Sequence, residues 1–205
     1  MPSFAEQLAI LNRWERFPGR TQAEGPHPAL TFDDGPDPDA TPAVLDALDE
    51  IGAEATFFMV GEQVEAHGEL ASAVVERGHR VGLHGMRHVP PDQLTDPESD
   101  LRRAAAVVHE ATGVRVEQFR PPYGAFDAPL YEATEALGLE PVLWSAWGLD
   151  WEPIPAQRIA ELVITGLEPG GIVVLHDSAR YAPRESAAAT AEAVRLLGDS
   201  QFRFG

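Results

Sequence analysis

The sequence predicts an α/β fold built on a parallel sheet. Short apolar runs that suit buried strands alternate along the chain with longer segments that suit helices, and this alternation is typical of parallel sheets with crossover helices. Several helical segments begin with Pro near the first turn and stop at Gly, as helix starts and ends commonly do. A chain of 205 residues is long enough to bury the core of one such domain without internal staples.

Six apolar runs are predicted as buried strands, and a weaker seventh lies near the end of the chain. In order they are Ala29–Phe32, Ala55–Val60, Arg80–Leu83, Glu117–Arg120, Pro141–Trp144, Ile172–His176 and the weaker Phe202–Phe204. The predicted helices between them are Thr41–Ile51, Glu62–Arg77, Pro97–Thr112, Pro129–Leu137, Pro155–Leu167 and Arg184–Leu197. The glycines that end them are Gly52, Gly78, Gly113, Gly138 and Gly198.

Residues 1–27 are predicted to form an N-terminal arm packed on a single domain of residues 28–205. Leu8, Leu11, Trp14 and Phe17 have the spacing of a short amphipathic helix, and Pro18 with Gly19 would end it. The opening residues carry neither a basic nor an apolar stretch, and no apolar run approaches 18 residues. We therefore expect a cytoplasmic protein without a membrane span.

The composition narrows the chemistry that the chain can support. The formal net charge is −18, which repels phosphate backbones and anionic membranes, so nucleic acid is not an expected partner. The chain has no Cys, so a metal site would have to use His, Asp or Glu.

Polar side chains that can do chemistry follow five of the predicted strands. They are Asp33 and Asp34, then His84 and His88, then Arg120 to Tyr123, then Asp150 and Trp151, and finally His176 and Asp177. Sites in parallel α/β folds gather at the carboxyl ends of the strands. We expect these residues to converge on one rim.

The pairs Asp33–Asp34 and His84–His88 indicate a metal site, although each pair also has an ordinary interpretation. Two adjacent carboxylates at a strand end repel each other unless a positive charge lies nearby, but Asp-Asp-Gly is also a common solvated turn. Two imidazoles four residues apart can share one face and bind one metal, but they can equally be surface histidines. On one rim, the two pairs together favour a divalent metal, with Zn²⁺ ahead of Co²⁺ or Mn²⁺.

The complete set of motifs resembles the polysaccharide deacetylase family, also called carbohydrate esterase family 4 or the NodB-like domain. The resemblance runs from about Ala29 to Leu197, with five motifs in the family's order. The matching segments are Thr31–Pro36, His84–His88, Arg120–Tyr123, Asp150–Trp151 and Leu175–Asp177. The resemblance implies a distorted parallel (β/α) barrel with fewer strands than the usual eight, in agreement with the seven predicted.

The resemblance also implies a role for each motif residue. Asp34, His84 and His88 would bind the metal, Asp33 would act as the general base, and Arg120 would hold Asp33 ionised. The backbone N–H of Tyr123 would stabilise the oxyanion. His176 would protonate the leaving amine, with Asp150 orienting it, while Trp151 and Leu175 would form a pocket for the acetyl methyl group. From the residues alone, Arg120 can also be a structural bridge, Asp150 a turn residue and the Tyr123 ring simple packing.

Two positions depart from the family pattern. Gly85 stands where the family has Ser or Thr, so we expect a more mobile histidine loop and weaker metal binding. Trp147 stands where many members have a further acid, which changes the rim near His176.

The predicted activity is metal-dependent hydrolysis of the N-acetyl amide of an amino sugar, which releases acetate and a free amine. The bare N-terminus and short chain suggest a cytoplasmic oligosaccharide or sugar conjugate as substrate. Hydrolysis of a small non-sugar amide and catalytically silent carbohydrate binding are the alternatives.

Overall fold

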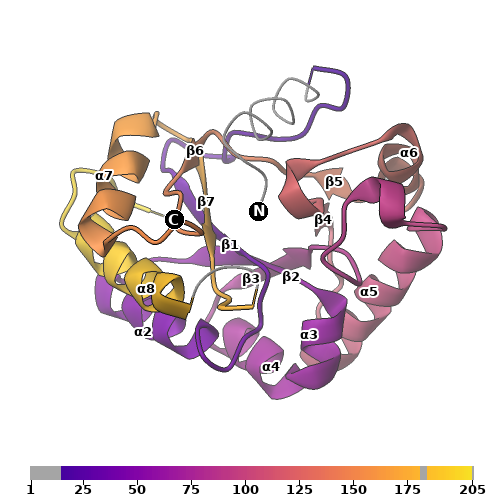
Figure 1. The fold of residues 1–205 in the computed structure, drawn as a ribbon, viewed down its shortest axis with the longest axis horizontal. Coiled ribbons are helices and arrows are strands. Elements are labelled where there is room, and N and C mark those ends of the chain that lie inside the picture. Colours follow the sequence, from indigo (N-terminus) through magenta and orange to yellow (C-terminus); the bar gives the residue numbers. More distant parts are fainter. Residues whose placement is uncertain (1–14, 181–183, 205) are drawn as a thin grey trace.

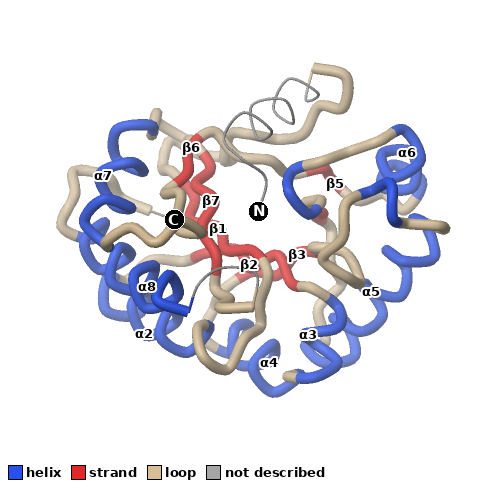
Figure 2. The backbone as a smooth tube through the Cα atoms, in the orientation of Figure 1, coloured by secondary structure: helices blue, strands red, loops and turns tan. Residues whose placement is uncertain are grey.

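The fold is a single curled sheet of seven parallel strands with helices packed on its outer face (Figure 2). The computed structural model describes residues 15–180 and 184–204. The spatial order of the strands is β5-β4-β3-β2-β1-β7-β6. Their bounds are β1 Ala29–Asp33, β2 Ala55–Met59, β3 Arg80–Leu83, β4 Gln118–Phe119, β5 Glu140–Pro141, β6 Ala146–Trp147 and β7 Ile172–His176. This confirms the predicted α/β barrel-like fold.

Helices cover the convex face of the sheet (Figure 1). They are α2 Thr41–Ile51, α3 Gly61–Ala66, α4 Gly68–Glu76, α5 Pro97–Thr112, α6 Ala128–Ala136, α7 Ala156–Gly166 and α8 Arg184–Gly198, with short 3₁₀ turns η1 Pro91–Gln93 and η2 Pro122–Gly124. The predicted bounds of α2 and α5 match, and both helices end at a left-handed glycine, Gly52 and Gly113. The single helix predicted over Glu62–Arg77 is instead two helices that meet at His67.

Because side chains alternate along the central strands, the outer face of the sheet is hydrophobic and the inner face carries the polar residues of the candidate site. On β1, Leu30 and Phe32 are fully buried in the hydrophobic core, whereas Thr31 and Asp33 point the opposite way. Asp33 pairs in register with His176 of β7, so these two side chains lie on the same face at neighbouring strand ends. The sheet thereby delivers both residues to the inside of the barrel.

The sequence-based strand assignments were wrong at both ends of the sheet. The run Pro141–Trp144 contributes only a two-residue strand at Glu140–Pro141, and a further strand, β6, which was not predicted, lies at Ala146–Trp147. Phe202–Phe204 is not a strand; Phe202 and Phe204 pack against the core as partly buried side chains. Alternating aromatic residues suit a terminal segment that packs on the core as well as a strand, which is why the pattern was misleading.

The sheet remains open between β5 and β6, and the segment Arg20–Ala23 crosses this opening (Figure 1). Arg20 donates its N–H to Pro141 O at 2.8 Å and accepts the N–H of Leu143 at 2.8 Å, while Ala23 donates to Gly170 O at 2.7 Å. This segment belongs to the predicted arm. The rest of the predicted arm helix, around Leu8, Leu11 and Trp14, lies outside the described residues.

No helix in the described part of the chain combines the length and apolar character needed to cross a bilayer.

Candidate active site

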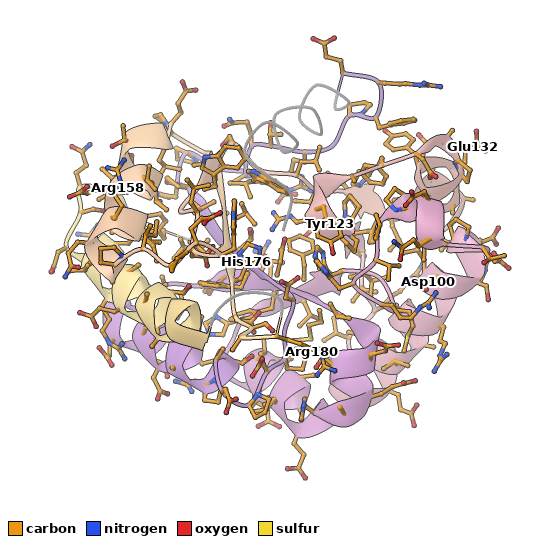
Figure 3. The ribbon with its side chains drawn as sticks, in the orientation of Figure 1. Asp100, Tyr123, Glu132, Arg158, His176 and Arg180 are labelled. Carbon is orange, nitrogen blue, oxygen red and sulfur yellow. The ribbon has the colours of Figure 1, made fainter. Side chains whose placement is uncertain are left out.

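The predicted rim residues converge at the carboxyl ends of β1, β3 and β7 and the loops after β4 and β6. His176 and Tyr123 lie near the centre of the barrel as seen in Figure 3. Three non-glycine residues of the described chain have a positive φ: Asp34 at 82°, Tyr123 at 61° and Leu149 at 52°. Each lies in, or directly before, one of the five motifs. Strained backbone of this kind costs free energy and tends to gather at functional sites.

Asp34, His84 and His88 bring three donor atoms together. Nε2 of His84 lies 3.3 Å from Asp34 Oδ1, and Nε2 of His88 lies 3.2 Å from the same oxygen. The three ligand atoms lie within 4.8 Å of one another. Asp34 Oδ1 is buried and has no hydrogen-bond partner among the described residues.

The protonation states of this cluster are those that a metal site needs. Burial lowers the pKa of His88 to about 4, despite the attraction of Asp34, so the ring is neutral at pH 7. Burial opposes ionisation of Asp34, but His88 and His84 outweigh it and hold the pKa of Asp34 well below its usual range. Nδ1 of His84 lies 2.8 Å from the carbonyl oxygen of Arg120. A carbonyl can only accept, so Nδ1 carries the proton and Nε2 presents a lone pair to the cluster.

The donor set therefore fits a cation. A carboxylate oxygen and two imidazole nitrogens lie within 4.8 Å of one another, and ring lone pairs that face a carboxylate repel it unless a positive ion sits among the three. One carboxylate and two imidazoles are ordinary ligands of catalytic zinc and leave further coordination positions open.

Asp33 is held by Arg120 in a buried ion pair. Nη1 of Arg120 donates to Asp33 Oδ1 at 2.7 Å and to Thr31 Oγ1 at 2.7 Å, and Nη2 donates to Leu143 O at 2.9 Å. Arg120 is completely buried, and its guanidinium lies 4.2 Å from the centre of the Phe58 ring. Burial lowers the pKa of Arg120, although the nearby charge of Asp33 opposes this shift. An arginine in a protein nevertheless keeps its charge at physiological pH. The second oxygen of Asp33 lies 4.0 Å from His84 Nε2, beside the possible metal site.

His176 is held by Asp150. The two oxygens of Asp150 lie 2.9 Å from His176 Nδ1 and 2.7 Å from its backbone nitrogen, and Thr190 Oγ1 donates to Oδ2 at 2.9 Å. Although burial favours the neutral ring, the charge of Asp150 and its hydrogen bond raise the pKa of His176 to about 10. The imidazole is thus a cation with Nδ1 engaged, and Nε2 is the nitrogen left for a ligand.

Two aromatic residues frame the site. The Trp151 ring stands perpendicular to the His176 ring at 5.4 Å, and the Tyr123 ring packs edge-on against His88 at 4.5 Å. The N–H of Tyr123 makes no hydrogen bond with another described residue. Leu175 is fully buried in the main core, and its place in a pocket for the acetyl methyl group stays a prediction.

Asp177, which follows His176, is structural. It is buried, its Oδ1 accepts the N–H of Gly35 at 3.1 Å, and Thr41 Oγ1 donates to its Oδ2 at 2.6 Å. A Cβ on Gly35 would overlap the Asp177 carboxylate. The loop that carries Asp34 is therefore tied to the end of β7.

Sequence reasoning did not identify the supporting hydroxyls and carboxylate. Thr31, Thr190 and Asp100 each hold a motif residue or its loop by a hydrogen bond. Thr31 lies inside a quoted motif and its inward position follows from strand alternation. Thr190 and Asp100 come from helices far away along the chain, and no local pattern distinguishes them.

Comparison with known proteins shows the family to which this chain belongs. The polysaccharide deacetylase family model matches residues 20–142. A peptidoglycan-N-acetylglucosamine deacetylase of Bacillus cereus is 34% identical over 86% of this chain and 84% of its own length. A chitooligosaccharide deacetylase of Rhizobium leguminosarum bv. trifolii is 38% identical over 72% of this chain and 70% of its own. The structure of a family 4 carbohydrate esterase from Streptomyces lividans, in complex with acetate, superposes with a TM-score of 0.73 at 30% identity, covering 86% of this chain and 90% of that one. With a family match over more than half of its length and two relatives above 30% identity over most of it, this chain belongs to the polysaccharide deacetylase family.

Proposed function

We propose that this protein is a metal-dependent deacetylase that hydrolyses the N-acetyl amide of an amino sugar or short oligosaccharide to acetate and a free amine. One observation carries the proposal: the possible cation site adjoins both Asp33, which is ion-paired with Arg120, and the imidazole of His176, which is held by Asp150 and interacts electrostatically with Asp34. Amide hydrolysis needs both a proton acceptor for water and a proton donor for the amine.

Asp34, His84 and His88 would hold the cation, and zinc suits this ligand set best, with cobalt or manganese as alternatives. A bound divalent cation polarises a carbonyl and can lower the pKa of water from 15.7 to about 7. The remaining chemistry belongs to the side chains of the chain itself.

Asp33 would take the proton from the attacking water. Its ion pair with Arg120 fixes one oxygen, which leaves Oδ2 beside His84 to act as the acceptor. Because Arg120 is in turn bound to two backbone carbonyls and Thr31, the carboxylate is aimed before any substrate arrives. Such preorganisation avoids reorientation during the reaction.

The N–H of Tyr123 would donate to the oxyanion of the tetrahedral intermediate. It is not used inside the described fold, and the left-handed backbone at Tyr123 sets its direction. One donor of this type is typically worth about 10²–10³ in rate.

His176 would then pass its Nε2 proton to the departing amine nitrogen. Asp150 holds the imidazole by Nδ1, so the ring is both oriented and charged for this transfer. The C–N bond breaks as the nitrogen gains the proton, and the products are a free amine and acetate. The Trp151 ring beside His176 would form the apolar wall for the acetyl methyl group.

An amino sugar as substrate is supported by the relatives, which are named for deacetylation of peptidoglycan N-acetylglucosamine and of chitooligosaccharides. The proposed unit comprises residues 28–205, with residues 1–27 as an arm. The Arg20–Ala23 segment across the barrel opening supports this division.

The test is acetate release from a panel of soluble N-acetylglucosamine oligomers, insoluble peptidoglycan and small N-acetyl amides. We expect turnover of the short oligomers. Activity on small amides alone would identify a non-sugar amidohydrolase. Sugar binding without acetate release from any member, with metal bound, would identify a silent binding protein.

A further inference from the structure

The loop that joins the two histidines of the possible metal site is held from outside by two helices. The first two N–H groups of α3 bind its carbonyls: Gly61 donates to Gly85 O at 2.9 Å and Glu62 donates to Met86 O at 2.9 Å. From the other side, Asp100 in the first turn of α5 accepts the N–H of Met86 through Oδ2 at 2.9 Å. Gly85 and Met86 are both buried.

Asp100 lies next to the space that a side chain at position 85 would enter. A Cβ built on Gly85 would lie 3.7 Å from Asp100 Oδ2 and 3.2 Å from Arg87 O. Gly85 also has a φ of +83°, which favours glycine over Ser or Thr. The backbone at this point therefore requires glycine, and the polar anchor of the loop comes from another helix.

Asp100 is remote from the reacting groups. In Figure 3 it lies to the side of Tyr123 that is away from His176, near the start of α5. It cannot be a metal ligand in this arrangement, because the three convergent donors are those of Asp34, His84 and His88.

We infer that Asp100 is a positioning residue, which holds the Gly85–Met86 turn so that His84 and His88 point at one cation. Partners that orient metal ligands typically contribute 10–100-fold to metal affinity. This inference rests on the proposed metal site, but its first measurement does not need the metal. It predicts that the loop of the metal-free protein depends on one carboxylate of α5.

The test compares Asp100→Ala with Asp100→Asn and with a matched control, Asp96→Ala. Asp96 caps the same helix, because its Oδ1 accepts the N–H of Ser99 at 3.0 Å, whereas the hydrogen bond to Met86 N comes from Asp100. Asp100→Asn keeps an oxygen acceptor and removes the charge. The control therefore separates weakening of α5 from loss of the loop contact.

Two readouts are needed. Amide hydrogen exchange in the metal-free protein should show Met86 exchanging about tenfold faster or more in Asp100→Ala, but not in Asp96→Ala. Zn²⁺ affinity, measured by competition with a chromophoric chelator, should fall about 10–100-fold in Asp100→Ala and stay near the wild-type value in the other two variants. Asp100→Ser, which carries a hydroxyl that is too short to reach Met86, replaces the alanine variant if that protein fails to fold.

Unchanged exchange at Met86 together with unchanged Zn²⁺ affinity in Asp100→Ala would overturn the inference. So would equal losses in Asp96→Ala, which would indicate a general effect of the helix, or in Asp100→Asn, which would indicate charge rather than the hydrogen bond. Wild-type protein that binds no Zn²⁺ would refute the proposed metal site, and the exchange data would still decide the role of Asp100 in the loop.

Discussion

Arg120 and Asp33 form a buried ion pair: the Arg120 side chain is 0% and the Asp33 side chain 4% exposed, and Nη1 lies 2.7 Å from Oδ1. Removing one member of such a pair leaves the other buried and uncompensated. The pair also aims the proposed general base. The same ion pair therefore contributes both to the stability of the folded barrel and to the orientation of the proposed general base.

Replacing Arg120 with Met should lower the free energy of unfolding by about 3–5 kcal/mol, because the buried Asp33 carboxylate would lose the guanidinium with which it is paired. Urea denaturation measures this change. The double variant Asp33→Asn/Arg120→Met should lose less than the sum of the two single losses. Additive losses would show that the pair is not energetically coupled.

Replacing Asp150 with Asn should lower the pKa of His176 from about 10, because the carboxylate is what raises it against the effect of burial. His176 must be protonated to act as an acid, so activity should be lost at a lower pH in this variant. A bound cation would repel the imidazolium. In the metal-loaded wild type and in the metal-loaded variant, the basic limb of the pH profile should therefore lie below pH 10. NMR titration of the imidazole and the pH profile of kcat/KM are the measurements. An unchanged basic limb would contradict the role of Asp150.

The same pair makes stability depend on pH. The pKa of His176 is raised in the folded protein from 6.5 to about 10. Its stabilising contribution is therefore complete below pH 6.5 and is lost as the pH rises toward 10. In the metal-free protein, the free energy of unfolding should fall across this window in the wild type and much less in Asp150→Asn. Equal slopes for the two proteins would show that the pair does not contribute.

Asp177 should lower the stability of the folded protein when it ionises, unlike an ordinary acid on the surface. Burial raises its pKa to about 7, although Thr41 and Gly35 donate hydrogen bonds to it. The unfolded chain ionises near 3.8, so the group destabilises the folded protein progressively from about pH 4 to pH 7. Asp177→Asn imitates the neutral acid and should abolish this dependence. Urea denaturation of the metal-free protein at pH 4.5 and 7.5 tests it, and an unchanged difference between the two pH values would contradict it.

Restoring Ser at position 85 should harm rather than help. The residue would have to adopt a φ of +83° with its Cβ 3.2 Å from Arg87 O, which costs about 1–2 kcal/mol. Gly52→Ser is the matched control, because it has a φ of +66° and nothing within 4 Å of its Cβ. Both variants should lose stability, but only Gly85→Ser should weaken Zn²⁺ binding. Tighter Zn²⁺ binding in Gly85→Ser would show that the missing hydroxyl limits the site.

The helices and strands that could be predicted from the sequence are those with clear local sequence patterns. Helices α2 and α5 have Pro in the first turn and a left-handed Gly at the end, and the central strands are continuous apolar runs. The two-residue strands β4, β5 and β6 contain too few residues to show a period, and their pairing depends on where the open edge of the barrel falls. Phe202 and Phe204 alternate like a strand but pack as a tail.

The site was predictable to the extent that its residues follow strand ends. Asp33, Asp34 and His176 are positioned by β1 and β7, so their convergence follows from topology. Thr190 reaches Asp150 from α8, a contact between segments that no local pattern links.

The central claim is that Asp33 and a cation held by Asp34, His84 and His88 act together on an N-acetyl group. The most direct test is acetate release from N-acetylglucosamine oligomers by wild-type protein and Asp33→Asn loaded with equal Zn²⁺. We expect that the wild-type protein loses activity on chelation and recovers it with one equivalent of Zn²⁺, whereas Asp33→Asn binds Zn²⁺ equally but turns over about 10²–10⁴-fold more slowly. Equal rates for the two proteins, or wild-type activity that survives complete removal of metal, would contradict it.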